Sequence, residues 1–201
     1  MIYLIGPRDH GEHVQDIEAM YKLRYEYFYK NLKWKVKIHQ GMEKDEYDAR
    51  NPHYVIYKDQ SNIVKGCARL IEMTNGSMFE CSFDFLLPNL ESFKKPGIWE
   101  ISRFAIATEC DEEETEQIFL SLIAALSHFG LKDGIPKTYL TLSYPASIEL
   151  AEKLGIPVKV IKKGKINNEP VVTLVYKPEP KNHAELLQKL SANKTPVVFF
   201  R

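Results

Sequence analysis

The chain has 201 residues, of which 44% are hydrophobic and 27% are charged, a mixture that excludes both a mostly disordered chain and a fibrous repeat. This length favours a single domain over residues 1–201. The 27 lysines and arginines balance the 27 aspartates and glutamates, which argues against a general binder of nucleic acid.

The first half of the chain combines short strands with one long amphipathic segment. Ile17, Tyr21 and Phe28 recur at helical spacing over residues 14–29, which predicts a helix with one apolar stripe facing a core. The following segment, 31–51, is polar and irregular. We expect strands over residues 2–5, 53–58, 62–71 and 98–107, the second and third joined as a hairpin at 59–62.

The second half begins with a predicted helix over residues 112–130. The acidic stretch at its start, 109–116, suits the positive end of a helix dipole. Pro145 begins a second helix, which ends at Gly155. Further predicted elements are strands over 137–143, 157–162 and 170–177, a helix over 182–191, and a final strand or tail over 197–200. This order predicts an α/β fold with a mixed central sheet flanked by helices.

Charge is distributed unevenly along the second half. Residues 108–152 hold nine acidic residues and two lysines, whereas residues 153–201 hold ten basic and three acidic residues, giving net charges of −7 and +7. Such asymmetry can create a surface that meets a charged partner. Alternatively, the two segments neutralise each other within the fold.

Metal, disulfide and membrane chemistry are not expected from this sequence. Cys67, Cys81 and Cys110 show no CxxC spacing, and His10 and His13 form an isolated HxxH pair, so we predict neither a disulfide framework nor a metal site. The N-terminus lacks the apolar region of a signal peptide, and no run approaches the ~20 apolar residues of a membrane helix. We therefore expect a cytoplasmic monomer without stable membrane insertion.

Arg24 lies where an apolar residue is expected, on the same helical stripe as Ile17 and Phe28. A buried guanidinium needs a carboxylate partner, because burying a lone charge is very costly. The polar loop offers Asp45 and Asp48, three residues apart, which one local turn would aim the same way. Alternatively, Arg24 extends to solvent and the loop acids are simply solvated.

Three more charges interrupt strands that should be partly buried. Arg69 shares a strand face with Cys67 and Ile71. Glu100 and Arg103 fall on opposite faces under strict alternation, so both can serve one site only if the strand bulges between them. Balanced buried charge of this kind suits a zwitterionic ligand, and it equally suits a structural ion-pair network.

In order and spacing, these residues resemble the acyl-homoserine-lactone synthases, the autoinducer synthases of bacterial quorum sensing. The resemblance spans residues 24–104. It comprises Arg24-x-x-x-Phe28, Trp34, Glu43-x-Asp45-x-x-Asp48, Gly-Cys-Ala-Arg69-Leu and Trp-Glu100-Ile-Ser-Arg103-Phe104. It implies a fold related to that of the GCN5-type N-acetyltransferases.

The resemblance further implies that S-adenosylmethionine is a substrate, with no separate cofactor, and that the other substrate is an acyl thioester, usually carried by acyl carrier protein. The methionyl amine attacks the thioester, and the carboxylate of that intermediate then displaces methylthioadenosine to close the lactone. Glu100 is the expected base for the amine. The expected substrate-binding residues are Arg24, Phe28, Trp34, Asp45, Asp48, Arg69, Arg103 and Phe104.

The acyl chain of such a substrate needs an apolar tunnel. Thr141 stands where relatives that prefer a 3-oxo chain also have threonine, and its hydroxyl can donate to a 3-oxo group. Equally, it can bond to the backbone. Residues of the right kind to line a tunnel, each also ordinary for a core, are Val64, Ala68, Leu70, Ile101, Phe104, Leu122, Leu140 and Leu142.

The nature of the thioester can be argued from charge. Coenzyme A binding commonly uses a glycine-rich turn at a helix start to hold the pyrophosphate, but the corresponding turn here, 107–114, is acidic and lacks glycine. A carrier protein would instead present an acidic helix to a basic surface. Lysines that could form that surface, or could simply be solvated, are Lys153, Lys159, Lys162, Lys163 and Lys165.

Two other functions are compatible with the pattern. One is an acyl-coenzyme A-dependent N-acyltransferase that acts on another amine and releases no methylthioadenosine. The other is a non-catalytic binding module that keeps the ion-pair network for stability.

Overall fold

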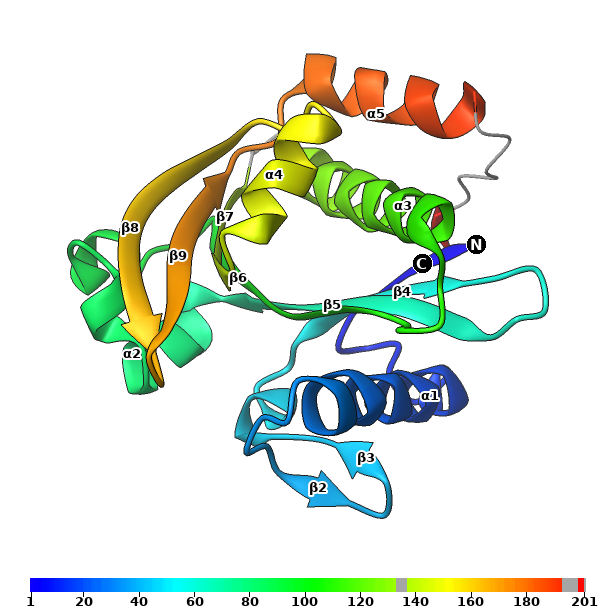
Figure 1. Cartoon of the computed structure of the whole chain (residues 1–201), viewed down its shortest axis with the longest axis horizontal. Helices are drawn as coiled ribbons and strands as arrows, with labels where there is room; N and C mark the ends of the chain where they lie inside the picture. Colours follow the sequence, from blue (N-terminus) through cyan, green and yellow to red (C-terminus); the bar gives the residue numbers. More distant parts are fainter. Residues whose placement is uncertain (133–136, 193–198, 201) are drawn as a thin grey trace.

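The protein is built on one eight-stranded mixed sheet with helices on both faces (Figure 1). The computed structural model describes residues 1–132, 137–192 and 199–200. The strands lie in the order β10-β1-β4-β5-β6-β7-β9-β8. Their bounds are β1 Ile2–Ile5, β4 His53–Lys58, β5 Val64–Glu72, β6 Ile98–Ile106, β7 Thr138–Ser143, β8 Val158–Ile166, β9 Glu169–Tyr176 and β10 Phe199–Phe200.

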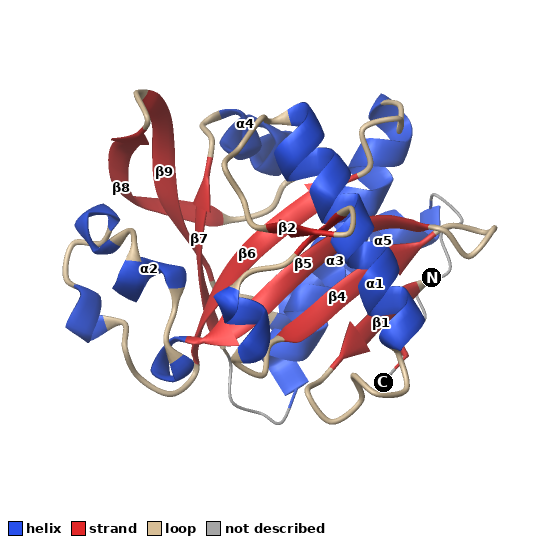
Figure 2. Ribbon diagram, turned by 90° about the horizontal axis from the view of Figure 1, so that it is seen from below, coloured by secondary structure: helices blue, strands red, loops and turns tan. Residues whose placement is uncertain are grey.

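Helices α3, α4 and α5 cover one face of the sheet, and α1 with the small hairpin β2–β3 lies on the other (Figure 1). The short helix α2 lies to one side, near β6 and β7 (Figure 2). The bounds of these elements are α1 Val14–Arg24, β2 Ile38–His39, β3 Met42–Glu43, α2 Met78–Cys81, α3 Glu112–Leu131, α4 Ala146–Lys153 and α5 Pro180–Ala192.

Each face of the sheet has its own hydrophobic core. On one face α3 packs on the sheet, and its start is fixed by a capping box in which Asp111 accepts from the Glu114 amide and Glu114 reaches back to the Asp111 amide. On the other face α1 buries Ile17, Met20 and Tyr21. The chain then continues as a π-helical segment, which prolongs the predicted helix to residue 31.

The pairing of β5 with β6 contains a β-bulge, which the sequence required only if Glu100 and Arg103 serve one site. Arg69 lies opposite Ser102 and Cys67 lies opposite Ala105, so β6 has one residue more than β5 between these pairs. Arg103 lies in this extra stretch with a φ of 53°, a left-handed conformation that is uncommon for a residue with a side chain.

The bulge changes which face each side chain of β6 meets. Directly opposed residues of antiparallel strands share a face, so Ser102 and Ala105 both face the α1 side, although they are three apart. Glu100 faces the same side. Phe104 turns to the other side, where its ring lies 5.3 Å from that of Phe119 in α3.

Strands β6 and β7 part along their length. They pair in parallel from Ile98 and Thr138 to Ile101 and Thr141, and no pair is formed beyond that point within the described residues. Beyond it β6 pairs with β5, and β7 pairs with β9. Figure 2 shows the two strands diverging, and within the described residues their facing edges form no sheet pair beyond that point.

The predicted fold class is confirmed, and most predicted elements form within two residues of their expected bounds. The hairpin of β8 and β9 turns at Asn167 and Asn168, which both have positive φ. Short helical turns within residues 73–92 were not predicted. Of the expected final strand, residues 197–198 lie outside the described part, and β10 pairs in parallel with β1. Among the described residues, no helix combines the length and hydrophobicity of a membrane span; a cytoplasmic monomer stays a prediction.

Candidate active site

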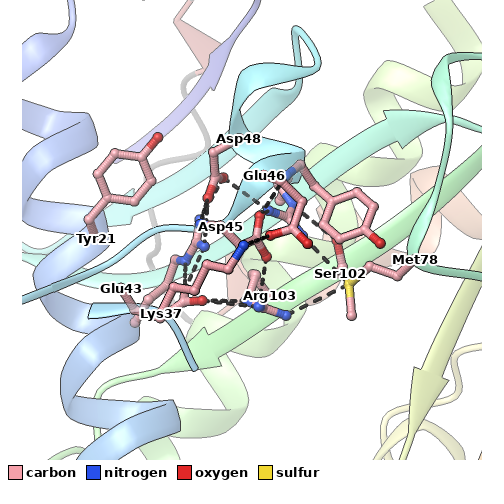
Figure 3. A network of polar contacts seen from close by, with 12 residues as sticks. Tyr21, Lys37, Glu43, Asp45, Glu46, Asp48, Met78, Ser102 and Arg103 are labelled. Atoms are coloured by element: carbon pink, nitrogen blue, oxygen red, sulfur yellow. Dashed lines mark hydrogen bonds and ion pairs between the residues drawn. The ribbon is translucent and has the colours of Figure 1, made fainter. Parts of the chain in front are cut away.

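Arg24 ends α1 and is completely buried between Glu43 and Asp48, two carboxylates that are labelled in Figure 3. Its Nε donates to Glu43 at 2.5 Å, and its two terminal nitrogens donate to the two oxygens of Asp48 at 2.9 Å. Burial by itself lowers the pKa of Arg24, but Asp48 and Glu43 outweigh burial and hold the pKa above its ordinary value. The solvated alternative for Arg24 is therefore wrong.

A short 3₁₀ turn over Glu46–Ala49 aims Asp45 and Asp48 at the arginines. Asp45 caps this turn by accepting from the Tyr47 amide, and Asp48 accepts from the Asp45 amide at 2.9 Å. Each carboxylate thus fixes the backbone that positions the other. The two acids are three residues apart because this is the spacing at which each side chain reaches the backbone of the turn that holds the other.

Arg69 and Arg103, the second of which is labelled in Figure 3, complete the network. Arg69 is completely buried, forms an ion pair with Asp45, and lies 3.1 Å from Asp48. Arg103 contacts Glu43 at 3.0 Å and Asp45 at 2.7 Å. The left-handed backbone of Arg103 turns its side chain to the same side as the other arginines.

Asp48 receives an additional hydrogen bond from the sheet. The hydroxyl of Tyr54, in β4, donates to it at 3.0 Å and in turn lies 2.9 Å from the hydroxyl of Tyr21. Burial and the negative charge of Asp48 raise the pKa of Tyr54, which therefore keeps its proton. Burial alone would raise the pKa of Asp48, but Arg24 and Arg69 outweigh it and hold that pKa well below its usual value.

The network described so far is electrically neutral, because three arginines face three carboxylates. Fixed, mutually hydrogen-bonded charges of this kind form a rigid polar surface, and removing any one leaves the buried network with one uncompensated charge. Within residues 1–132, 137–192 and 199–200, no group of three or more potential ligands is arranged to hold a metal ion.

Glu100 lies beside this network and is only 2% exposed. Its Oε2 accepts from the amides of Met78 and Phe79 at 2.7 and 3.4 Å. Its Oε1 is buried without a hydrogen-bond partner among the described residues. Burial raises the pKa of Glu100, and the positive charge of Arg69 opposes this only in part. A buried carboxyl with a raised pKa and a free oxygen is suited to accept a proton.

Aromatic rings line the open side of the network. The ring of Trp34 stacks on Phe28 at 5.2 Å and lies 6.3 Å from the ring of Tyr144, which follows β7. The guanidinium of Arg103 lies 5.4 Å from the centre of the Phe28 ring. Trp34 is 37% exposed, which is high for a tryptophan, so part of its side chain is accessible to a ligand.

The arrangement can bind a small molecule that carries both signs of charge and an aromatic or cationic group. The arginines can receive a carboxylate. Glu100 can receive an amine, and the faces of Phe28 and Trp34 can receive a sulfonium or a purine. The predicted constellation of Arg24, Asp45, Asp48, Arg69, Glu100 and Arg103 is therefore brought together in one place.

Comparisons with known proteins identify the same family as the sequence motifs. A sequence model of the autoinducer synthase family matches residues 10–187. The chain belongs to the autoinducer synthase family. An acyl-homoserine-lactone synthase of Vibrio anguillarum is 31% identical over 148 residues, which cover 71% of this chain and 74% of the relative. The prediction of an acyl-transferring enzyme of this family is confirmed.

Solved structures support the fold of this autoinducer synthase. A CoA-dependent acyl-homoserine lactone synthase, BjaI, solved with SAM and isopentyl-CoA, covers 100% of this chain and 92% of its own at 21% identity and a TM-score of 0.85. A candidate N-acetyltransferase of Lactobacillus plantarum matches at a TM-score of 0.55, with 13% identity over 89% of this chain and 98% of its own. The predicted relation to the N-acetyltransferase fold is confirmed.

Some predicted site residues of the synthase lie away from the charge network. Phe104 packs on α3, on the opposite face of the sheet from Glu100. Thr141 shares that opposite face by strand alternation, and its hydroxyl donates to the Leu142 carbonyl at 3.3 Å. Leu142 is half-buried on the Glu100 side, in a cluster with Phe79 and Leu140.

The predicted basic surface of the synthase is divided. Lys153 forms ion pairs with Glu112 and Glu116 of α3, so this part of the charge asymmetry is neutralised within the fold. Along the edge strand β8 the lysines are exposed, and none has an ion pair with a described residue. They are Lys159, Lys162, Lys163 and Lys165. Lysines on an edge strand also discourage pairing with other sheets, which is a purely structural role.

Four residues of the site did not emerge from sequence reasoning as site residues. Glu43 was present in the motif, but the network makes it the bridge between Arg24 and Arg103. Ser102 accepts from the Arg69 Nε at 3.1 Å. Met78 and Tyr54 contact the network from α2 and β4. Only Glu43 carried a usable signal, its two-residue spacing from Asp45.

Proposed function

We propose that this synthase makes an N-acyl-L-homoserine lactone from S-adenosylmethionine and an acyl thioester. The observation that carries the proposal is the unpartnered, buried Oε1 of Glu100 beside a neutral network of arginines and carboxylates. Asp45 Oδ2 also lacks a hydrogen bond but forms an ion pair with Arg103, whereas Glu100 Oε1 has neither among the described residues and is therefore suited to receive an amine.

Charge complementarity supports S-adenosylmethionine as the amine. Its amine and sulfonium are positive and its carboxylate is negative, so the molecule carries one net positive charge. The three arginines and three carboxylates cancel. Ionised Glu100 therefore gives the site one net negative charge, and neutral Glu100 gives none. Binding of the cation favours the ionised form of Glu100, which is the form that acts as a base.

The reaction then follows from the positions of these groups. Glu100 takes a proton from the amine, whose nitrogen attacks the thioester carbonyl. A C–N bond forms, the C–S bond of the thioester breaks, and the released thiolate takes up the second proton that the nitrogen loses on becoming the amide. A carboxylate oxygen of the product next attacks the γ-carbon. The O–C bond closes the lactone, and the C–S⁺ bond breaks to release neutral methylthioadenosine. Holding both reactants in line supplies much of the rate advantage.

Phe28 and Trp34 are proposed to bind the adenosine and sulfonium part of the substrate. Their stacked rings border Arg103, so a molecule held by the arginines can reach the accessible part of Trp34. This role explains why Trp34 stays partly exposed next to a buried network.

The acyl chain is proposed to pass where β6 and β7 part, beyond Ile101 and Thr141. Unpaired backbone groups on the facing edges of these strands can bond to the thioester arm. Phe104 and Thr141 then line the α3 side of the passage, and Leu142 lines the Glu100 side. Thr141 reaches a 3-oxo group only if its hydroxyl leaves the Leu142 carbonyl.

Acyl carrier protein is the proposed donor of the acyl chain. At the start of α3, where a pyrophosphate of coenzyme A would be held, the Glu114 amide already donates to Asp111 and the Asp111 amide to Glu114. Three glutamates, Glu112, Glu113 and Glu114, occupy the first turn of the same helix. This negative surface repels a pyrophosphate. Coenzyme A is the alternative donor, because the structural relative BjaI is CoA-dependent.

The exposed lysines of β8 are proposed as the docking surface for the carrier protein. We expect the double variant K162E/K163E to lose at least tenfold in kcat/KM with acyl carrier protein as donor, and to keep its rate with a small acyl thioester. Lys22, exposed on α1, provides the control variant K22E. An equal loss of kcat/KM with both donors contradicts docking of the carrier protein on these lysines. If kcat/KM is unchanged with both donors, the lysines only prevent the edge strand from pairing with other sheets.

The proposed reaction is tested by mass spectrometry of the purified chain with S-adenosylmethionine and acyl carrier protein loaded with acyl chains of different length. We expect acyl-homoserine lactone and methylthioadenosine in equal amounts. An acylated amine formed without methylthioadenosine would instead establish a plain N-acyltransferase.

A further inference from the structure

Among the described residues, two donor nitrogens of the charge network, one on Arg69 and one on Arg103, contact no oxygen atom. Every other nitrogen of the Arg69 and Arg103 guanidiniums contacts a carboxylate or the Ser102 hydroxyl. The remaining nitrogen of each contacts one shared atom, the Sδ of Met78, at 3.6 and 3.7 Å (Figure 3). The two guanidiniums therefore converge on a single point.

A thioether is a poor partner for this point. Its sulfur is a weak acceptor, whereas a guanidinium nitrogen donates strongly to a carboxylate oxygen at about 2.7–2.9 Å. The contact is enough to cover two buried donors, yet it leaves most of their hydrogen-bonding energy unused. Any carboxylate that reaches this point gains two charge-assisted hydrogen bonds in exchange for two weak ones.

Met78 is also built to move without disturbing the base. Its backbone amide holds Glu100 at 2.7 Å, and Ser77 caps the short helix that begins at Met78. The side chain is only half-buried and has three rotatable bonds. The thioether can therefore swing out while the amide keeps its hydrogen bond to Glu100.

We propose that the thioether of Met78 is a placeholder for the substrate carboxylate, covering Arg69 and Arg103 in the free enzyme and leaving when the α-carboxylate of S-adenosylmethionine binds there. This inference rests on the proposed function, since it assigns the carboxylate subsite of the same substrate. It places the carboxylate next to Glu100. The amine is bonded to the same carbon as the carboxylate, so it is delivered towards the free Oε1.

The inference predicts opposite effects for two substitutions of Met78. In M78Q the amide oxygen is a strong acceptor that competes with the carboxylate, so the Kd for S-adenosylmethionine rises at least tenfold. In M78L a side chain of similar size covers the arginines without any acceptor, so the Kd stays equal or falls. Both variants keep the backbone amide that holds Glu100.

Methylthioadenosine is the discriminating probe, because it lacks the amino-acid carboxylate. Isothermal titration of the wild type, M78Q, M78L and the core control M73L should give the same Kd for methylthioadenosine within twofold. Met73 is 1% exposed and lies in a hydrophobic cluster without charged groups. Thermal unfolding of each variant identifies any loss of the native fold. If M78Q does not fold, the Kd of M78L for S-adenosylmethionine is the measurement that tests the inference.

Each outcome decides for or against the placeholder. A tenfold loss confined to M78Q and to S-adenosylmethionine supports it. Equal losses for both ligands, unchanged binding in M78Q, or a tenfold loss in M78L overturns it while leaving the proposed function intact. A wild-type chain that binds no S-adenosylmethionine contradicts the proposed function, and the placeholder with it.

Discussion

Glu43 offers the sharpest test of the buried network, because it is completely buried and bridges two arginines. Its two oxygens separately contact Arg24 at 2.5 Å and Arg103 at 3.0 Å. The substitution E43Q keeps the shape of the side chain but removes its charge. It also turns an NH₂ group, a donor, towards one of two guanidiniums that can only donate.

The expected destabilisation follows from this geometry. Neutralising one partner of a buried ion pair costs about 3–5 kcal/mol. In E43Q, Arg24 keeps Asp48 and Arg103 keeps Asp45, but the buried network is left with one uncompensated positive charge. For a chain of this length each kcal/mol lowers Tm by about 2–4 °C, so we expect a fall of roughly 6–20 °C. The same change frees Arg103 from one anchor and weakens the binding of S-adenosylmethionine.

Thermal and urea unfolding of the wild type, E43Q and E46Q measure the effect. Glu46 is the matched control, since its ion pair with Lys37 at 2.8 Å is exposed and screened by solvent. We expect E46Q to unfold like the wild type. If E43Q also unfolds within 2 °C of the wild type, the network does not hold the fold as described.

Two further predictions separate the roles of individual groups. Glu100 acts as a base only when ionised, and burial raises its pKa, so kcat/KM should decrease tenfold per pH unit below a midpoint that lies above the 4.5 of an ordinary glutamate. A midpoint at or below 4.5 contradicts this prediction. Trp34→Ala should raise the Kd for methylthioadenosine at least tenfold with little change in Tm, because Trp34 is partly exposed. Phe104→Ala should instead lower Tm, because the packing of its ring on Phe119 is lost. Calorimetry of both variants, with titration of methylthioadenosine, distinguishes the two effects.

The sequence predicted most of this site because buried charges interrupt otherwise apolar patterns. Arg24 on a helical stripe required carboxylates, and two acids three residues apart were available. The bulge in β6 was required by geometry, since Glu100 and Arg103 otherwise point to opposite faces. These inferences depend only on period and charge, which a single sequence carries.

What the sequence did not predict depends on three-dimensional packing. Glu43 lies in a two-residue strand, too short to show a pattern, and is buried only because α1 and Arg103 close over it. Phe104 follows the bulge, so the extra residue sends it to the α3 face instead of the face that carries Glu100. The contact of Met78 with two arginines arises from a short helix that has no periodic signal in the sequence.

The central claim is that Glu100 accepts the proton of the substrate amine, and its direct measurement is a single-turnover rate of amide formation in E100Q. General-base catalysis contributes about 10²–10⁴-fold, so we expect E100Q to keep its fold and lose at least about 100-fold in this rate. Glu91, exposed in a neighbouring turn, gives the control E91Q, which should react like the wild type. A folded E100Q that forms the amide within tenfold of the wild-type rate would contradict the account.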